Sequence, residues 1–517
     1  MLKRILNGSA GATCEGKSVK NASVFTSSST VRPGDGRTSG VAYDTSWVAR
    51  LTDSGGTPLF PECTQWLLTH QKPDGSWGSQ TLQYHDRILS TLGAIIALKK
   101  VYGDRFAPSI EQGERYIWEH IGNLKIDSNR LIGSELLLPA LMWQAESEGL
   151  NLPFHRVPYT HEYTQKLAKI DESLWYSPET TLSFSLEFCG EEVDLKRLPG
   201  AQLPNGSVAN SPAATAFFLM HIHDSGALQY LIEILRLTQD GSIMTVYPVN
   251  TFEYGWVMYN LILAHVHADW YGPMCKFLVR HLNSTGIGCS TESPLSDADD
   301  TAVVYRVLSH MGYPVDFGVF ENYKTETCFL TYFFEMNPSV STNIHVLDLV
   351  NSCPNFPERE IILEKLLHFL KRCMEDGHWM DKWHISPYYP TCHAVFPLCH
   401  VDPSLADRII SWIIDSQNSD GTWGAEGGTH EETAYAMQAL LYYTMFEQVD
   451  ADCTLQALTH IDTAYPLDSP ANLWIGKVLY CPTRVVQSSS LSAWLMHKMT
   501  CWDILSSHRQ RGDHLDI

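Results

Sequence analysis

The sequence has no uninterrupted apolar run of about 18 residues or more, so it predicts no membrane-spanning helix. Positive charge is also scarce. The 36 Lys and Arg residues face 58 Asp and Glu residues, which gives a formal net charge of −22. Such an acidic chain is poorly suited to nucleic acid or to an anionic membrane surface as its main partner. The charge still allows a small anionic ligand held in a local cationic pocket.

The cysteines lack the spacing of a disulfide framework. There are 13 of them, an odd number, scattered along the chain, and we interpret them as reduced thiols of a cytoplasmic protein. One cluster, Cys392, His393, Cys399 and His400, does not have the spacing of a zinc site. We therefore expect a buried helix face there.

Residues 1–39 lack helical or strand periodicity. They are rich in Ser, Thr and Gly, and Glu15 and Asp35 are their only acidic residues. The apolar centre of a secretory signal is also missing. We expect a flexible N-terminal extension, with a transit peptide as the alternative.

Strand-like alternation is scarce as well, whereas apolar residues recur at helical spacing in most long segments. Ile88, Leu92 and Ile95 mark one such face, and Val303 and Val307 mark another. The sequence therefore predicts an all-α protein.

Two segments share the pattern Q-x-x-D-G-x-W-G, at residues 71–78 and 417–424. In both, an acid (Asp86 or Glu432) follows eight residues after the last Gly and opens an apolar helix. A match that keeps its register into the next helix indicates internal duplication. The Asp-Gly pair suits a tight turn, and the Trp offers a large surface to the following helix. We interpret both segments as stability devices of two related helical units.

A cluster of three carboxylates begins a predicted helix in "SDADDTAVVY", residues 296–305. Ser296 and Asp299 have the spacing of a capping box, which would explain part of the cluster. Capping does not need three acids, however. If Asp297, Asp299 and Asp300 are buried together, they cannot all ionise, and a proton is retained at neutral pH. Such a carboxylic acid could protonate a very weak base, of which a carbon–carbon double bond is the extreme case.

The D-x-D-D pattern and the Q-x-x-D-G-x-W repeats on an all-α chain resemble the class II terpene cyclases, which include the squalene–hopene and copalyl-type diterpene cyclases. The resemblance extends over nearly all of residues 40–500. Among copalyl-type members the chain is most similar to the bacterial halimadienyl diphosphate synthases. The blocks that carry it, in order, are "AYDTSWVARL" (42–51), "GSVANSPAATAFFL" (206–219), "TVYPVNTFEYGWV" (245–257), "MDKWHISPYYPT" (380–391) and "LWIGKVLY" (473–480).

The resemblance implies a role for each carboxylate. Asp299, the middle aspartate of the motif, would be the general acid, and Asp297 and Asp300 would hold its geometry and support its acidity. His345 matches the position that supplies a hydrogen-bonding partner to the acid, where plant copalyl enzymes have Asn. A protonated His beside a carboxylate would make the acid stronger.

The terminating base of the plant ent-copalyl enzymes is not matched. Those enzymes hold a water with a His and an Asn, and the resemblance places Phe184 and Thr245 at these two positions. A cation that persists would permit hydride and methyl shifts, which lead to halimane or clerodane products. Tyr480 is a candidate for proton removal or cation stabilisation, with a structural role as the alternative.

In this class the diphosphate of the substrate is a handle, which cations must hold. Lys382 is the first candidate, and Arg50 and Lys477 are weaker ones. Mg²⁺ is the usual partner of the diphosphate in the family. Of the acidic loop that plant members use for the metal, this sequence keeps only Asp127, followed by Glu135. We therefore assign no metal ligands from the sequence.

Aromatic residues in the matching blocks are candidates to line the substrate cavity. Ring faces stabilise carbocations, and a dry cavity prevents early capture by water. Plain core packing is the alternative for each ring. The candidates are Trp256, Trp379, Trp383, Tyr388 and Tyr389.

The sequence has no convincing D-D-x-x-D motif, which class I enzymes use to ionise the diphosphate. We therefore predict that the diphosphate is retained and that no class I α domain is present. By analogy with the family we expect two α-barrel domains. A β domain over 40–55 and 265–517 would carry the acid, a γ domain over 56–264 would be inserted in it, and the site would lie between them.

The favoured function is protonation-initiated cyclisation of geranylgeranyl diphosphate to a bicyclic diterpene diphosphate of halimadienyl, clerodane (kolavenyl) or copalyl type. A downstream class I synthase or a phosphatase would consume it. The alternatives are cyclisation of farnesyl diphosphate to a drimenyl product, a zinc prenyltransferase β-subunit and a non-enzymatic α-barrel scaffold. The scaffold would leave Asp299 exposed as a plain cap.

Overall fold

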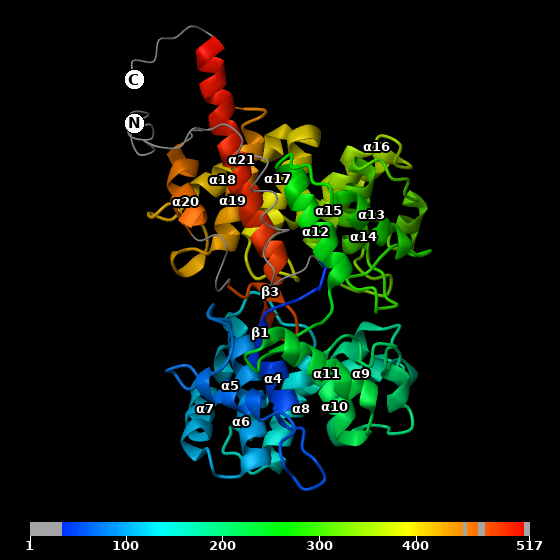
Figure 1. The fold of residues 1–517 in the computed structure, drawn as a ribbon, viewed down its shortest axis with the longest axis vertical. Coiled ribbons are helices and arrows are strands. Elements are labelled where there is room, and N and C mark those ends of the chain that lie inside the picture. Colours follow the sequence, from blue (N-terminus) through cyan, green and yellow to red (C-terminus); the bar gives the residue numbers. More distant parts are fainter. Residues whose placement is uncertain (1–33, 448–451, 464–470, 511–517) are drawn as a thin grey trace.

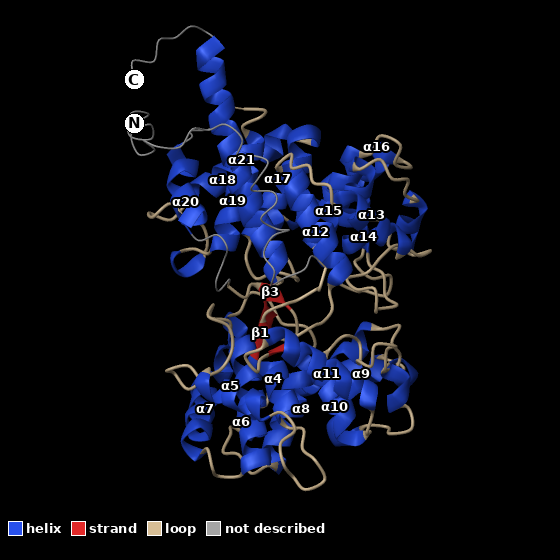
Figure 2. Ribbon diagram, viewed as in Figure 1, coloured by secondary structure: helices blue, strands red, loops and turns tan. Residues whose placement is uncertain are grey.

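The computed structural model describes residues 34–447, 452–463 and 471–510. It is built almost wholly of helices, and Figure 2 shows its few strands gathered where two helical halves meet. The predicted all-α class is thereby confirmed. Figure 1 shows the two halves stacked along the longest axis of the molecule.

The first half is a ring of helices. Helices α4, α6, α8 and α10, together with the segment Thr181–Glu192, pack each against the next and close on themselves, while α5, α7, α9 and α11 lie outside the ring. The bounds of the elements are β1 Gly40–Val41, α4 Ala42–Ala49, α5 Pro61–Thr69, α6 Tyr84–Tyr102, α7 Ala107–His120, α8 Ser134–Ser147, α9 Thr160–Lys169, α10 Pro212–His221, α11 Ser225–Thr238 and β2 Ile243–Met244.

The second half is a larger ring, in which α12, α14, α15, α17, α19 and α21 close on themselves and α13, α16, α18 and α20 lie outside. The bounds are α12 Asn250–Leu263, α13 Tyr271–Arg280, α14 Ala298–His310, α15 Val340–Ser352, α16 Arg359–Cys373, α17 Tyr388–Val401, α18 Pro403–Asp415, α19 His430–Tyr443, α20 Asp452–Thr463, β3 Trp474–Ile475, β4 Leu479–Tyr480 and α21 Thr483–Gln510. Short 3-10 helices lie in the connections, at Ile121–Ile126, Phe154–Arg156, Glu172–Leu174, Leu198–Ala201, Phe317–Asn322 and Ala425–Gly427.

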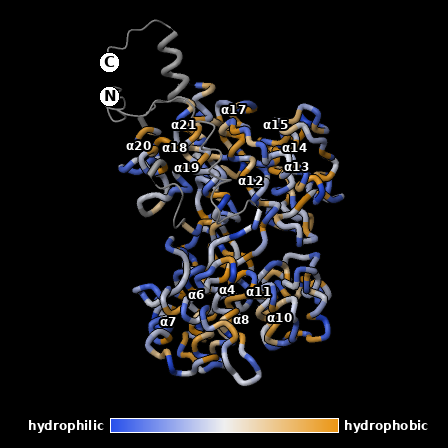
Figure 3. Tube along the Cα trace, viewed as in Figure 1, coloured by the Kyte–Doolittle hydropathy of each residue, from blue (hydrophilic) through white to orange (hydrophobic). Residues whose placement is uncertain are grey.

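Each ring encloses its own hydrophobic core, and the two cores correct the expected domain boundaries. Helix α4 lies in the first core and not with the acid-carrying half, because α6 and α10 bury it. Helix α12 belongs to the second core, where α14 and α21 pack against it. The β3–β4 hairpin returns to the junction, and its residues Ile475, Val478 and Leu479 complete the first core. Figure 3 shows hydrophobic stretches in both halves.

The two Q-x-x-D-G-x-W turns have the same structure. Gly75 and Gly421 have φ angles of +89° and +91°, which a residue with a side chain rarely adopts. The buried indoles of Trp77 and Trp423 donate to backbone carbonyls 2.7 and 2.6 Å away. Their backbone N–H groups donate to a threonine of the next inner helix. The acceptors are Thr91 Oγ1 at 3.0 Å and Thr433 Oγ1 at 3.1 Å.

Four more turns of the described chain repeat the backbone-to-threonine bond, although their sequences lack the full pattern. The repeated unit that the sequence shows twice therefore helps to build both rings. The further donor and acceptor pairs are Val208 and Thr215 (2.9 Å), Ile243 and Thr45 (2.8 Å), Ile287 and Thr301 (3.0 Å), and Trp379 and Thr391 (3.0 Å).

The expected flexible extension over residues 1–39 lies outside the described residues up to residue 33. The part that is described belongs to the fold, contrary to the expectation. Gly34 donates to Glu253 Oε1 at 2.9 Å, and Ser39 donates to the carbonyl of Cys481 at 2.8 Å. Within the described ranges, no helix combines the length and hydrophobicity needed to cross a membrane.

Candidate active site

A cavity of about 390 Å³ lies at the junction, with walls from both halves. The residues of the described chain that line it include no Lys, Arg or His, and most are apolar or aromatic. Residues from the first half include Ile132, Phe184, Leu203 and Thr245. Residues from the second half include Phe252, Cys289, Asp297, Asp299, Asp300, Tyr332, Trp383, Trp474 and Tyr480.

The three carboxylates stand at the start of α14. The residue that caps this helix is Asp297, whose side chain accepts the backbone N–H of Asp300 at 2.7 Å. The predicted capping box of Ser296 and Asp299 is therefore wrong by one residue. Ser296 instead bonds Asn283, because the pairing of Ile287 with Asp297 fixes where the extended chain ends. Asp299 becomes the second residue of the helix and is free of any capping duty.

Burial governs the charge state of this cluster. Asp297 and Asp300 are 4% and 5% exposed, and no Lys or Arg of the described chain pairs with either of them. Burial, reinforced by the charge of Asp299, raises the pKa of Asp297 to about 7. Burial and the charges of Asp297 and Asp299 raise the pKa of Asp300 well above its usual range. The cluster therefore retains a proton at neutral pH, as the sequence predicted for buried acids.

Asp299 reaches the cavity and has one firm partner. Its side chain is 14% exposed, and Oδ1 lies 2.6 Å from Nδ1 of His345, on α15. Nε2 of His345 lies 3.2 Å from Nδ1 of His393, on α17. The sequence pairs His345 with the acid through the resemblance alone. It offers no signal for His393, which was assigned to a buried helix face.

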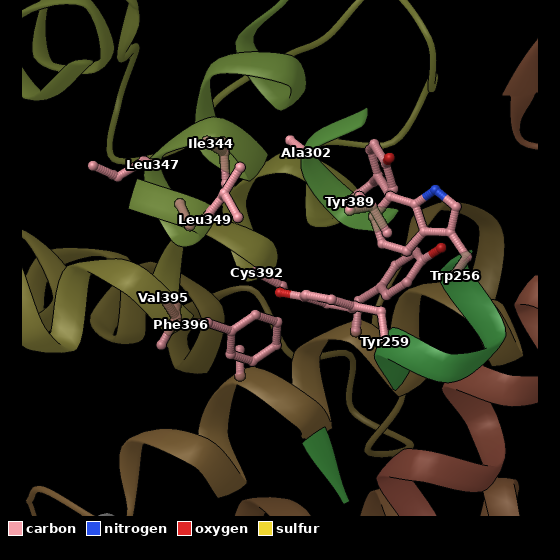
Figure 4. Packing of buried hydrophobic residues seen from close by; sticks show 14 of the residues in the cluster. Trp256, Tyr259, Ala302, Ile344, Leu347, Leu349, Tyr389, Cys392, Val395 and Phe396 are labelled. Carbon is pink, nitrogen blue, oxygen red and sulfur yellow. The ribbon is translucent and has the colours of Figure 1, made fainter. Parts of the chain in front are cut away.

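Aromatic rings hold this pair of histidines in place. Trp256 stands edge-on to His345 at 4.9 Å and stacks on His393 at 5.2 Å. Figure 4 shows Trp256 beside Tyr389 and Tyr259 in the second core. Burial and the charge of His345 lower the pKa of His393 well below its usual range, so its ring stays neutral. Behind His345, which bonds the acid, lies the neutral and closely packed ring of His393.

Comparison with known proteins gives the family. Residues 334–442 match the model of the squalene-hopene cyclase C-terminal domain. A type B diterpene cyclase of Mycobacterium tuberculosis is 33% identical over 486 residues, which cover 88% of this chain and 95% of that protein. The chain belongs to the type B diterpene cyclases. The resemblance that the motif blocks carried is thereby confirmed, and the protein is a class II diterpene cyclase.

Plant relatives match over a smaller part of their length. A (−)-kolavenyl diphosphate synthase of Tripterygium wilfordii is 32% identical over 371 residues, which cover 69% of the cyclase and 45% of that protein. The cyclase spans less than half of the length of these plant relatives. Among solved structures, the ent-copalyl diphosphate synthase from Streptomyces platensis has a TM-score of 0.77 at 24% identity, covering 93% of the cyclase and 99% of that chain. This likeness supports the fold.

The structure places the remaining predicted substrate-binding residues in two groups. Phe184, Thr245, Trp383 and Tyr480 line the cavity of the cyclase. Trp256 and Trp379 do not line it. Trp379 belongs to one of the repeated turns, where its indole donates to the carbonyl of Leu370 at 2.9 Å, so its assignment to the cavity is wrong.

The three cations proposed to hold the diphosphate all contact other protein groups, and none of them is among the residues that line the cavity. Lys382 is ion-paired with Glu335 at the cavity wall. Lys477 is fully buried, 2.7 Å from Glu187. Arg50 packs over the ring of Trp47 in the first core, so it is wrongly assigned.

The residues considered for Mg²⁺ do not fit a resident metal site. Asp127 accepts three internal hydrogen bonds, from the backbone N–H groups of Tyr84 and His85 at 3.0 and 2.9 Å and from His85 Nδ1 at 2.6 Å. Glu135 is ion-paired with Lys166. Within the described ranges, no three His, Cys, Asp or Glu side chains are arranged so that they could hold a metal ion.

Sequence reasoning missed several residues of the cavity wall, among them Phe252, Cys289, Tyr332 and Trp474. Trp474 stands in the quoted block "LWIGKVLY", so the block could have indicated it. Cys289 and Tyr332 lie in connecting segments without a periodic pattern. Only the folded chain brings them to the acid.

Proposed function

We propose that the cyclase converts geranylgeranyl diphosphate to a bicyclic diterpene diphosphate and that Asp299 protonates the terminal alkene. The observation that carries this proposal is the position of Asp299. Its carboxyl group lines an apolar cavity and is bonded to His345 through one oxygen only, beside two buried carboxyls. The other oxygen is available to a substrate in the cavity.

The residues around Asp299 support its action as an acid in two ways. When Asp299 loses its proton, an N–H of His345 can stabilise the anion through Oδ1. Burial raises the pKa of Asp297 to about 7 and the pKa of Asp300 well above its usual range, so the three neighbouring carboxyls share retained protons and Asp299 can carry one of them. Proton transfer to an alkene then leaves the negative charge on Asp299, where the hydrogen-bond donor His345 is already in place.

The walls of the cavity suit a carbocation. Phe252, Tyr332, Trp383 and Trp474 present aromatic rings, which attract cations more strongly where water is absent. Two rings then close in sequence, and proton loss ends the reaction. The diphosphate remains attached throughout.

Termination decides the product. Phe184 and Thr245 line the cavity where, by the resemblance, the plant enzymes hold their base. Phe184 has no basic atom, which favours a longer-lived cation and hence a halimadienyl or clerodane (kolavenyl) skeleton over a copalyl one. Burial raises the pKa of Tyr480, so its phenol stays neutral and its oxygen is a candidate acceptor for the last proton.

Incubation with geranylgeranyl diphosphate and Mg²⁺, followed by dephosphorylation, should yield a bicyclic alcohol that mass spectrometry and NMR identify. Mg²⁺ enters here as the counter-ion of the substrate. Asp299→Asn should abolish the product while circular dichroism stays unchanged. The matched control is Glu360→Gln, at a carboxylate that is 84% exposed on α16. Normal cyclisation by Asp299→Asn would refute the role of the acid.

A parallel incubation with farnesyl diphosphate tests the alternative drimenyl product. A higher kcat/KM for the shorter substrate would replace geranylgeranyl diphosphate in the proposal. Because the diphosphate is retained, a class I synthase or a phosphatase is the expected consumer of the product. The scattered cysteines, interpreted as reduced thiols, support a cytoplasmic location for these steps.

A further inference from the structure

Behind the cavity wall, a buried carboxylate touches the ring of Trp474. The indole N–H of Trp474 donates to Oε1 of Glu431 at 2.7 Å. Trp474 lines the cavity, whereas Glu431 does not line it and is only 1% exposed. Phe252 stands edge-on to the indole at 5.5 Å and fixes the plane of the ring. The indole therefore separates the substrate cavity from a buried acid.

Three hydrogen-bond donors converge on one oxygen of Glu431, the one that Trp474 contacts. Its Oε1 also accepts from the hydroxyl of Tyr435 at 2.9 Å and from Nε2 of His384 at 3.1 Å. Nδ1 of His384 accepts the backbone N–H of Ser386 at 3.1 Å, so the proton of this ring is on Nε2 and the ring is neutral. Three donors on one oxygen stabilise the anionic form of a carboxyl group, so we infer that Glu431 carries a negative charge.

The charge of Glu431 is not cancelled nearby. Within the described residues, no Lys or Arg forms an ion pair with it, and its Oε2 has no hydrogen-bond partner. Glu187, a comparable buried acid in the first half, lies 2.7 Å from Lys477. A buried charge without a counter-ion acts over a longer range than an exposed one, because the protein interior screens it weakly.

We propose that Glu431 is a positioning residue for the cation of the cyclisation and acts through Trp474. Its negative charge on the indole N–H raises the electron density of the ring face that meets the cavity. That face then holds the carbocation formed after protonation by Asp299. Glu431 neither gives nor takes a proton, and no bond to it forms or breaks. The cationic intermediate supplies the missing positive charge. This inference rests on the proposed function.

The test compares the affinities of the cyclase for a positively charged ligand and for a neutral ligand of the same shape. Glu431→Gln should lower kcat by about ten-fold or more with little change in KM. It should also weaken binding of an aza analogue of the prenyl diphosphate, whose protonated amine stands in for the carbocation, by a similar factor. A neutral analogue of the same shape should bind equally to both proteins. A merely structural role would affect both analogues alike.

The matched control is Glu432→Gln, which removes the same charge from the next residue of α19. Glu432 is 4% exposed and bonds Thr429 at the helix start, so its loss should affect stability and leave the difference between the two analogues unchanged. Trp474→Phe keeps a ring but removes the N–H that links it to Glu431. In the Trp474→Phe background, Glu431→Gln should have a much smaller further effect.

Equal affinity of Glu431→Gln and the unchanged cyclase for the aza analogue would overturn this inference. If Glu431→Gln does not fold, Trp474→Phe decides the question, because undiminished affinity for the aza analogue in that variant also overturns it. Cyclisation by Asp299→Asn would instead overturn the proposed function. The two failures are therefore distinguishable.

Discussion

Helices α4 and α14 occupy the same place in the two rings. Each follows an extended residue, Val41 with φ −135° and Asp297 with φ −140°. Each has a threonine as its fourth residue, and Thr45 and Thr301 accept the backbone N–H of a repeated turn at 2.8 and 3.0 Å. The residues between these landmarks are therefore equivalent. The same helix start therefore occurs in both halves, and the two halves differ in the side chains that stand at its equivalent positions.

The equivalent of Asp299 in the first half is Tyr43, and the equivalent of Asp300 is Asp44. Both Asp44 and Asp300 are buried. Asp44 lies 3.9 Å from the buried ammonium of Lys477, whereas no Lys or Arg of the described chain pairs with Asp300. Asp44 thus has a cation within reach, whereas Asp300 lies beside two other carboxyls, Asp297 and Asp299. The same helix start therefore carries a cation-paired acid in the first half and a cluster of three carboxyls in the second.

The largest effect is expected when the second residue of the helix is replaced in each half, Asp299 in α14 and Tyr43 in α4. Asp299→Asn should lower kcat by up to about 10⁴-fold and leave the free energy of unfolding nearly unchanged. Tyr43→Phe should do the reverse, since its hydroxyl donates to buried Glu187 at 3.0 Å and its loss should cost about 1–3 kcal/mol of stability. Single-turnover kinetics and urea unfolding measure the two quantities. The comparison fails if both variants lose activity equally.

Lys477→Met should be the most destabilising of these changes. It leaves Asp44 and Glu187 buried without their cation, which costs about 3–5 kcal/mol. The midpoint of urea unfolding should fall, while the protein that remains folded keeps its product pattern. A changed product pattern at full stability would mean that Lys477 takes part in the chemistry after all.

Asp44 in the first half and Asp297 in the second should contribute similarly to the pH dependence of stability. Burial raises the pKa of each to about 7. Between about pH 4 and pH 7 the folded protein holds protons that the unfolded chain releases. Its free energy of unfolding therefore falls as the pH rises through this window, by up to about 1.4 kcal/mol per pH unit for each group. Asp297→Asn and Asp44→Asn should each flatten the slope. Urea unfolding at several pH values checks this, and an unchanged slope would contradict the assigned charge states.

The smallest effect concerns the shared threonines. Thr45→Val and Thr301→Val each remove the acceptor of one buried backbone N–H, which costs about 1–2 kcal/mol. Because the two bonds are equivalent, the losses should agree within about 0.5 kcal/mol. A much larger loss for one variant would show that the two helix starts are not built alike.

The sequence predicted well what depends on neighbours along the chain. The helical faces, the paired Asp-Gly turns and the apolar helix after "SDADD" all follow from local spacing. The sequence-based prediction failed where a contact with a distant residue decides between two locally equivalent possibilities. Ser296 and Asp297 are both good capping residues, and the pairing of Asp297 with Ile287 selects the second. The turn at Trp379 was missed because the segment lacks the Gln of the pattern.

By itself, the sequence determined that the chain folds as duplicated helical units and that three carboxylates open one of the inner helices. Only the tertiary structure decided which carboxylate meets the cavity, which histidine bonds it and which acids have a cation. Asp299 and His345 are separated by 46 residues, and Glu431 and Trp474 by 43. Burial and charge pairing set the protonation of an acid, and both arise only when such distant residues pack together.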